Sequence, residues 1–118
     1  MESVTHYPAK QEKAPTILVF GGNPQRRAEV VSLLKTASDL NIYAALSESS
    51  GLETLDQLVD LDLVLIGGRY DQDQRNRIRE KLAQRFPLAY ISEPGFDYPY
   101  SNERILTDVQ SKVKHKIY

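Results

Sequence analysis

Four short apolar runs, spread over most of the chain, constrain its fold more than any other feature of the sequence. The first and third of them, TILVF and LDLVLI, are continuous runs of mostly branched apolar residues that end at glycines, which is typical of strands buried on both faces of a sheet. Segments with helical periodicity follow each of the four runs, and strands alternating with helices predict a small doubly wound parallel sheet in a three-layer α/β/α fold. The runs are TILVF (16–20), IYAAL (42–46), LDLVLI (61–66) and LAYIS (88–92).

The segments between and after these runs carry signals that start helices. Asn23 is a good N-cap and Pro24 suits the first helical position. The predicted helices cover residues 23–40, 52–59, 72–85 and a last segment, and their predicted caps are Asn23, Ser50 with Glu53, Asp71 with Gln74, and Ser101. Apolar residues at helical spacing predict buried stripes, which include Ala28, Val31, Leu34 and Ala37 in the first helix, Ile78, Leu82 and Ala83 in the third, and Ile105, Leu106, Val109 and Val113 in the last.

The length of 118 residues suits a single domain. Residues 1–15 are polar, contain two prolines and lack periodicity, so they are predicted to form a flexible N-terminal tail. The domain is expected to cover residues 16–113, with a basic tail at 114–118. His6 and His115 fall in or near these tails and are interpreted as surface residues.

Composition excludes several classes of function. A net charge of -1 argues against a dedicated nucleic-acid-binding protein, which usually has a marked basic excess. The absence of cysteine excludes disulfides, thiolate catalysis and cysteine zinc sites. No apolar run reaches membrane-spanning length and the N-terminus lacks a signal-peptide core, so we expect no membrane contact and a cytoplasmic protein.

Four local strings, in the right order, resemble those of a response-regulator receiver domain. They are ILVFGGNPQRR, LDLVLIGG, PLAYISE and YPYSNERIL, and together the resemblance covers roughly residues 16–113. It implies a flavodoxin-like, receiver-like sheet. In that family the first strand is followed by an acidic pair that binds metal, the third ends in the phosphate-accepting aspartate, and the fourth ends in a Thr or Ser.

The resemblance places glycine where the family has its reactive groups. The acidic pair falls on Gly21 and Gly22, the phosphoacceptor falls on Gly67, the switch hydroxyl falls on Ser92 and is retained, and the family's lysine falls on Tyr98. Glycine supplies neither metal ligand nor nucleophile. We therefore expect a non-enzymatic module without cofactor or metal, unable to undergo aspartyl phosphorylation, that works through an unidentified protein partner. Asp71 is a possible replacement acceptor, but the sequence favours it as a helix cap.

The resemblance departs from the family after Ser92. Only EPGFD separates Ser92 from Tyr98, which is too short for an ordinary helix, so the fourth helix and most of the fifth strand are expected to be missing. Residues 88–92 would then form an exposed sheet edge. The hypothesis is a homodimer that buries this edge; the alternative is that the same aromatic rings only repair local packing. The rings are those of Tyr90, Phe96, Tyr98 and Tyr100.

A second functional hypothesis is an anion or nucleotide site in the glycine-lined crevice at the carboxyl ends of the strands. Neither glycine pair forms a G-x-G-x-x-G fingerprint or a P-loop, and glycine often serves only to turn the chain. The charged segment around RNRIREK is interpreted as a solvated outer face, with phosphate binding as its alternative. The candidate residues of the crevice are Gly21, Gly22, Asn23, Gly67, Gly68, Arg69 and Ser92, and Arg26 and Arg27 are further candidates to add charge.

Overall fold

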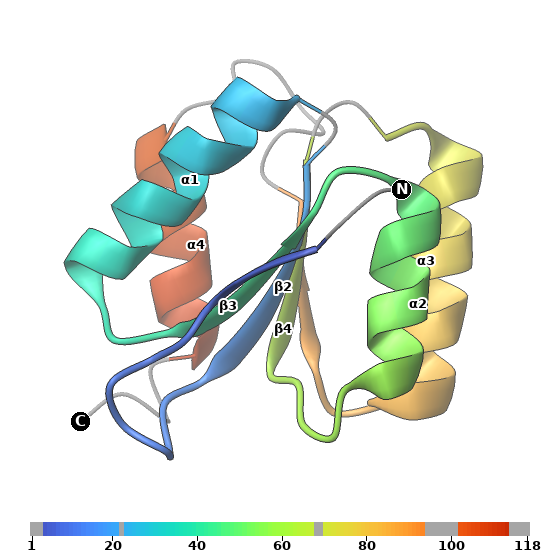
Figure 1. Cartoon of the computed structure of the whole chain (residues 1–118). Coiled ribbons are helices and arrows are strands. Elements are labelled where there is room, and N and C mark those ends of the chain that lie inside the picture. Colours follow the sequence, from blue (N-terminus) through green and yellow to red (C-terminus); the bar gives the residue numbers. More distant parts are fainter. Residues whose placement is uncertain (1–3, 22, 68–69, 94–101, 114–118) are drawn as a thin grey trace.

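The computed structural model describes residues 4–21, 23–67, 70–93 and 102–113, and it confirms the predicted α/β architecture (Figure 1). A five-stranded sheet has the order β1-β3-β2-β4-β5, in which β2, β3, β4 and β5 are parallel and β1 is antiparallel. The strands are β1 (Thr5–Tyr7), β2 (Thr16–Phe20), β3 (Asn41–Ala45), β4 (Leu63–Ile66) and β5 (Tyr90–Ser92). The helices are α1 (Pro24–Ala37), α2 (Glu48–Gln57), α3 (Gln72–Arg85) and α4 (Asn102–Val113).

The helices cover both faces of the sheet. Figure 1 shows α1 and α4 on one side of the sheet and α2 and α3 on the other. Strands β2 and β4 are buried along their whole length, as the continuous apolar runs predicted. Alternate side chains of β2 enter the two cores: Ile17 and Val19 pack with α1 and α4, whereas Leu18 and Phe20 pack with α2 and α3. None of the helices that the structure describes is long and apolar enough to cross a membrane.

Two of the predicted helix starts are confirmed. The side chain of Asn23 accepts a hydrogen bond from the N–H of Arg26 at 2.9 Å, and Pro24 occupies the first turn of α1. Asp71 and Gln74 form the complete capping box of α3, with bonds of 2.8 and 2.9 Å. These starts depend on residues three apart, which explains why the sequence alone reveals them.

The predicted start of α2 is wrong. This helix begins at Glu48 with Ser47 as its N-cap, whose hydroxyl accepts from the N–H of Ser50 at 3.2 Å. Ser50 is instead buried in the first turns, and Gly51 follows it inside the helix. The earlier start allows the backbone of Gly51 to lie directly against the ring of Phe20.

The predicted buried stripes are too broad. Ala28 and Ala37 in α1 and Ala83 in α3 are exposed, while Val31, Leu34, Ile78 and Leu82 are buried as expected. In α3 the third buried residue is Arg75. A small side chain gains little from burial, so periodicity assigns alanine to the core less reliably than leucine or isoleucine.

The N-terminal segment is not loose throughout, so that part of the tail prediction is wrong. Residues Thr5–Tyr7 form β1, in which Thr5 lies opposite Ala44 and Tyr7 opposite Ile42. The His6 ring stacks on Tyr43, with 4.1 Å between the ring centroids. A strand of three residues has no periodic signal of its own, because its conformation depends on pairing with the edge of β3.

Residue Asp39 fixes the loop between β1 and β2 to the rest of the domain. Its carboxylate accepts the backbone N–H groups of Lys10 and Gln11 at 2.8 and 3.0 Å. The N–H of Lys10, together with that of Gln11 and the charge of Lys35, holds the pKa of Asp39 below its ordinary value despite the opposing effect of desolvation. Asp39 is therefore ionised, and accepts both bonds, at neutral pH.

Candidate functional site

The carboxyl ends of β2, β4 and β5 bring together the described residues that the sequence singled out. Gly21, Gly67 and Ser92 lie at or just beyond these three ends, and Asn23 begins the helix that follows β2. This edge of a parallel sheet is where open α/β folds place their ligands. The predicted residues Gly22, Gly68, Arg69, Phe96, Tyr98 and Tyr100 lie outside the described residues, as does the segment in which the helix and strand were expected to be missing.

The two candidate glycines that the structure describes, Gly21 and Gly67, extend the sheet. The N–H of Gly21 donates to the carbonyl of Ala45, and the N–H of Gly67 donates to that of Phe20, both at 2.9 Å. Neither amide is therefore directed at a ligand. A Cβ atom on Gly67 would lie 3.1 Å from the Phe20 carbonyl oxygen, and one on Gly21 would lie 3.0 Å from Cβ and Cγ of Arg27. The backbone at both positions is packed more closely than most side chains tolerate.

A buried arginine, which the sequence did not reveal, lies at the end of β4. Arg75 is only 1% exposed. Its Nη2 donates to the carbonyl of Gly67 at 2.7 Å, and its Nε donates to that of Tyr70 at 2.9 Å. Its Nη1 donates to Oε1 of Glu93 at 2.6 Å. One guanidinium thus joins the end of β4, the start of α3 and the residue that follows β5.

Glu93 completes this cluster. Its side chain is 15% exposed, and its second carboxylate oxygen is bound by Arg79, one turn further along α3. Two guanidinium groups therefore hold one carboxylate, directly after the strand that ends in Ser92. We refer to Arg75, Arg79 and Glu93 as the arginine clamp. A buried charge is tolerated only with partners of this kind, and here both backbone and side-chain acceptors satisfy the guanidinium of Arg75.

The remaining basic residues of α3 bind α2. Arg77 forms an ion pair with Glu48, and Lys81 pairs with Asp56 at 3.0 Å. The hydrogen bond from Arg77 holds the pKa of Glu48 below its ordinary value, against the opposing effect of partial burial. Arg85 donates to the carbonyl groups of Leu55, Asp56 and Leu58. The interpretation of this segment as a solvated face is thus wrong for Arg75, and the side chains of Arg77, Lys81 and Arg85 join α3 to α2.

The described carboxylates near this edge are not grouped as a metal site. Asp71 lies four residues beyond Gly67, but its side chain caps α3 by accepting from the N–H of Gln74. Within the described ranges, no group of three or more His, Cys, Asp or Glu side chains is arranged to hold a metal ion. Phosphoryl transfer to a carboxylate needs oxygen ligands that hold Mg²⁺ beside it.

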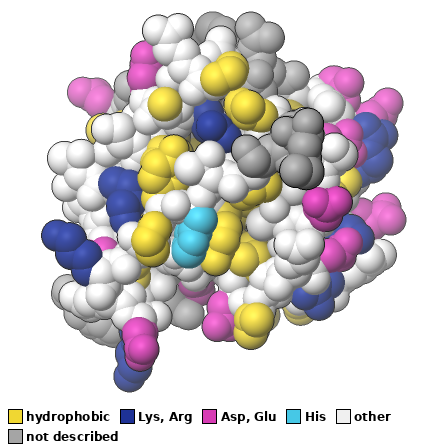
Figure 2. Space-filling view, in the orientation of Figure 1, with side chains coloured by type: hydrophobic (Ala, Val, Ile, Leu, Met, Phe, Trp, Pro, Cys, Tyr) yellow, Lys and Arg dark blue, Asp and Glu magenta, His cyan; other side chains and the backbone are white. Residues whose placement is uncertain are grey.

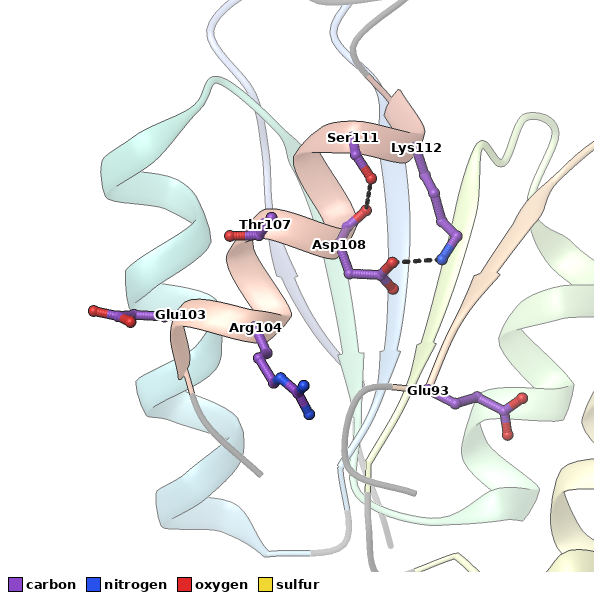
Figure 3. Close-up of a pocket in the computed structure, with 7 residues that line it drawn as sticks. All are labelled: Glu93, Glu103, Arg104, Thr107, Asp108, Ser111 and Lys112. Atoms are coloured by element: carbon purple, nitrogen blue, oxygen red, sulfur yellow. Dashed lines mark hydrogen bonds and ion pairs between the residues drawn. The ribbon is translucent and has the colours of Figure 1, made fainter. Parts of the chain in front are cut away.

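Ser92 is fully buried, and its hydroxyl donates to Oδ2 of Asp108. The other oxygen of Asp108 binds Nζ of Lys112 at 2.6 Å (Figure 3). A hollow of about 620 Å³ lies beside these residues, but Ser92 does not line it. An enclosed hydroxyl with no histidine base beside it among the residues that the structure describes is not arranged as a nucleophile. The described lining residues are Glu93, Glu103, Arg104, Thr107, Asp108, Ser111 and Lys112.

The hollow carries charges of both signs on α4. Figure 3 shows Lys112 directed toward Asp108, while the carboxylate of Glu93 points away from α4. There it binds Arg75 and Arg79 of α3. The hydroxyl of Ser111 donates to the backbone carbonyl of Asp108 at 3.0 Å. Asp108 and Glu93 thus both have cationic partners from this chain.

Comparisons with known proteins show similarity in the fold alone. No protein-family model matches the sequence, and no curated protein matches it. A LuxR family DNA-binding response regulator from Silicibacter pomeroyi superposes with a TM-score of 0.66, at 16% identity over 86% of this chain and 92% of that chain. A response regulator from Thermotoga maritima gives a TM-score of 0.64, at 18% identity over 86% of this chain and 98% of that chain. The predicted receiver-like fold is confirmed.

Proposed function

We propose that this chain is a non-catalytic, receiver-like signalling module that binds a protein partner and does not undergo aspartyl phosphorylation. The receiver-like fold supports the signalling role. The arginine clamp is the observation that carries the rest of the proposal. The position that corresponds to the phosphoacceptor is Gly67, and its carbonyl is bound by the buried guanidinium of Arg75.

The chemistry of phosphoryl transfer supports this assignment. A carboxylate must attack phosphorus, and carboxylate or carbonyl oxygens must hold the Mg²⁺ that neutralises the transferred group. Gly21 and Gly67 offer no side chain, and their amides are bonded to neighbouring strands. Asp71, Asp108 and Glu93 already have partners in this chain. A signal would therefore enter through binding of a partner.

Self-association at the β5 edge is part of the proposal. Among the strands that the structure describes, β5 pairs only with β4, and Tyr90 is 43% exposed. An edge strand presents backbone groups that a second chain can pair with. We expect light scattering at high protein concentration to give the mass of a dimer, and a monomer would count against this surface.

The anion or nucleotide site has less support. Two of its expected donors, the amides of Gly21 and Gly67, are used by the sheet, and the side chain of Asn23 accepts from Arg26. A ligand that binds only the native state raises the melting temperature. In a thermal-shift screen with nucleotides and phosphorylated metabolites at millimolar concentration we expect no shift, and a clear shift would favour this function over the interaction module.

Restoring one carboxylate is not expected to restore phosphorylation. The variant Gly67→Asp places an acid at the position of the phosphoacceptor, but the described part of the chain has no group of three or more His, Cys, Asp or Glu side chains arranged to hold a metal ion. After incubation with a small phosphodonor and Mg²⁺, we expect its intact mass to be unchanged. Circular dichroism is used to check that the Gly67→Asp variant folds, and a receiver domain with an intact acidic site is the positive control. A stable gain of one phosphoryl group would show that the site still supports the chemistry.

A further inference from the structure

We propose that β1 is an exchangeable strand, through which two copies of the chain associate by each pairing its β1 with β3 of the other copy. This surface lies at the opposite edge of the sheet from β5. Figure 2 views the molecule from this side and shows a histidine side chain among hydrophobic ones. This proposal goes beyond the proposed role as a non-catalytic, receiver-like signalling module and does not depend on that role.

Mostly exposed contacts hold β1 in place. The strand has three residues, none of them fully buried. The His6 ring lies on Tyr43, and its Nε2 is 2.6 Å from Oδ1 of Asn41, a contact that is exposed. Of the three residues, Tyr7 packs against the core as a partly buried side chain. Elements with few buried apolar contacts open at low free-energy cost, so β1 is expected to separate from β3 without unfolding the domain.

The loop that follows β1 is long enough to reach a second molecule. It comprises residues 8–15 and joins β1 to β2, which lie on either side of β3. These two strands are about 10 Å apart, since neighbouring strands are separated by roughly 4.8 Å. An extended loop of this length spans about 26–29 Å at roughly 3.3–3.6 Å per residue. Pro8 and Pro15 bound the loop and favour extended backbone in the residues before them.

The edge of β3 is complementary to β1, so the β1 strand of a second copy can bind there. When β1 leaves, β3 (Asn41–Ala45) becomes the edge strand on this side of the sheet. An edge strand with unpaired backbone groups tends to pair with another chain. The β1 strand of another copy makes the same contacts with Ala44, Tyr43 and Ile42 that it makes within its own chain. Exchange of an identical element therefore preserves the pairing of β1 with β3 while joining two chains, although the loop must leave Asp39.

Cysteine cross-linking tests the exchange directly, because the natural chain contains no cysteine. Thr5 and Ala44 lie opposite each other in the antiparallel pair, a separation that a disulfide can bridge. One preparation carries Thr5→Cys and another, with a different tag, carries Ala44→Cys. After the two are mixed, incubated and oxidised, exchange predicts a disulfide-linked heterodimer on a non-reducing gel. The control pairs Thr5→Cys with Gln84→Cys, an exposed position on α3.

The expected result is a severalfold higher heterodimer yield for Thr5→Cys with Ala44→Cys than for the control pair. Weakening the anchor of the loop with Asp39→Asn, which removes the carboxylate that binds Lys10 and Gln11, should make the heterodimer form faster. The double variant Thr5→Cys/Ala44→Cys reports pairing within one chain. If that variant forms its internal disulfide while the mixture gives no more heterodimer than the control, strand exchange is overturned.

A failure of the double variant to form its internal disulfide would also overturn the proposal, because β1 would then not pair with β3 as described. Should Ala44→Cys disturb the core, the opposite pair His6→Cys and Tyr43→Cys repeats the test on the other face of the sheet. The single variants His6→Cys and Tyr43→Cys are mixed in the same way, and the control pairs His6→Cys with Gln84→Cys. A heterodimer yield equal to the control in both pairs would contradict the exchange.

Discussion

Replacing Arg75 with methionine is expected to lower the free energy of unfolding by about 3–5 kcal/mol, the usual cost of removing one partner of a buried ion pair. The substitution keeps much of the side-chain volume but removes the guanidinium. The carbonyl groups of Gly67 and Tyr70 then lose donors, and Glu93 loses its buried partner. Urea denaturation followed by circular dichroism measures the change.

A matched control is Arg77→Met on the same helix. Arg77 is an exposed side chain that pairs with Glu48 across the surface, so its loss should change the urea midpoint little. Combining Arg75→Met with Glu93→Gln should cost less than the sum of the two single variants, because both changes remove the same ion pair between Arg75 and Glu93. Equal effects of Arg75→Met and Arg77→Met would contradict the structural role of the arginine clamp.

Replacing Gly51 with alanine is expected to destabilise the protein by about 3 kcal/mol, at the upper end for overpacked cores. The added Cβ atom would lie 2.0 Å from Cε2 and 2.5 Å from Cζ of Phe20. Phe20 is fully buried, and its ring packs edge-to-face against Tyr70, with 5.9 Å between the centroids, so it has little room to move. The direction of the change is informative, because alanine in an exposed helix interior is more stable than glycine by about 1 kcal/mol. A loss of stability therefore reports the close contact with Phe20.

Urea denaturation measures this prediction too, with Ser49→Ala as the control, an exposed position in the same helix. The control should leave the midpoint almost unchanged. Phe20→Leu shortens the side chain that the new methyl group meets, so Gly51→Ala should cost much less in that background than in the natural chain. A stabilising effect of Gly51→Ala alone would show that α2 does not approach Phe20 as closely as described.

The parts of the fold that the sequence predicted are those with local signals. The apolar runs of β2 and β4 and the caps Asn23 and Asp71 depend on residues that are neighbours in the chain, so they were visible without a structure. The start of α2 was missed because Ser47 and Ser50 are both plausible caps. The choice between them depends on contact between Gly51 and Phe20, which are far apart in sequence.

The candidate site also depends on contacts between residues that are far apart in the sequence. The glycines at the strand ends were identified from the resemblance, but Arg75 was hidden in a run of charged residues. Its burial depends on Glu93, 18 residues away, and on the carbonyl of Gly67. Local periodicity cannot distinguish an arginine that faces solvent from one that binds a neighbouring strand end. Strand β1 was missed for a related reason, since only the β3 edge makes those residues extended.

The most direct test of the proposed function is phosphorylation of the natural chain. The protein is incubated with a small phosphodonor and Mg²⁺, and its intact mass is measured before and after, with an active receiver domain treated in parallel. Gly67 has no nucleophile, its carbonyl is bound by Arg75, and Asp71 caps a helix, so the mass is predicted to stay unchanged while that of the control rises. A stable gain of one phosphoryl group, located on an aspartate by fragmentation, would contradict the account.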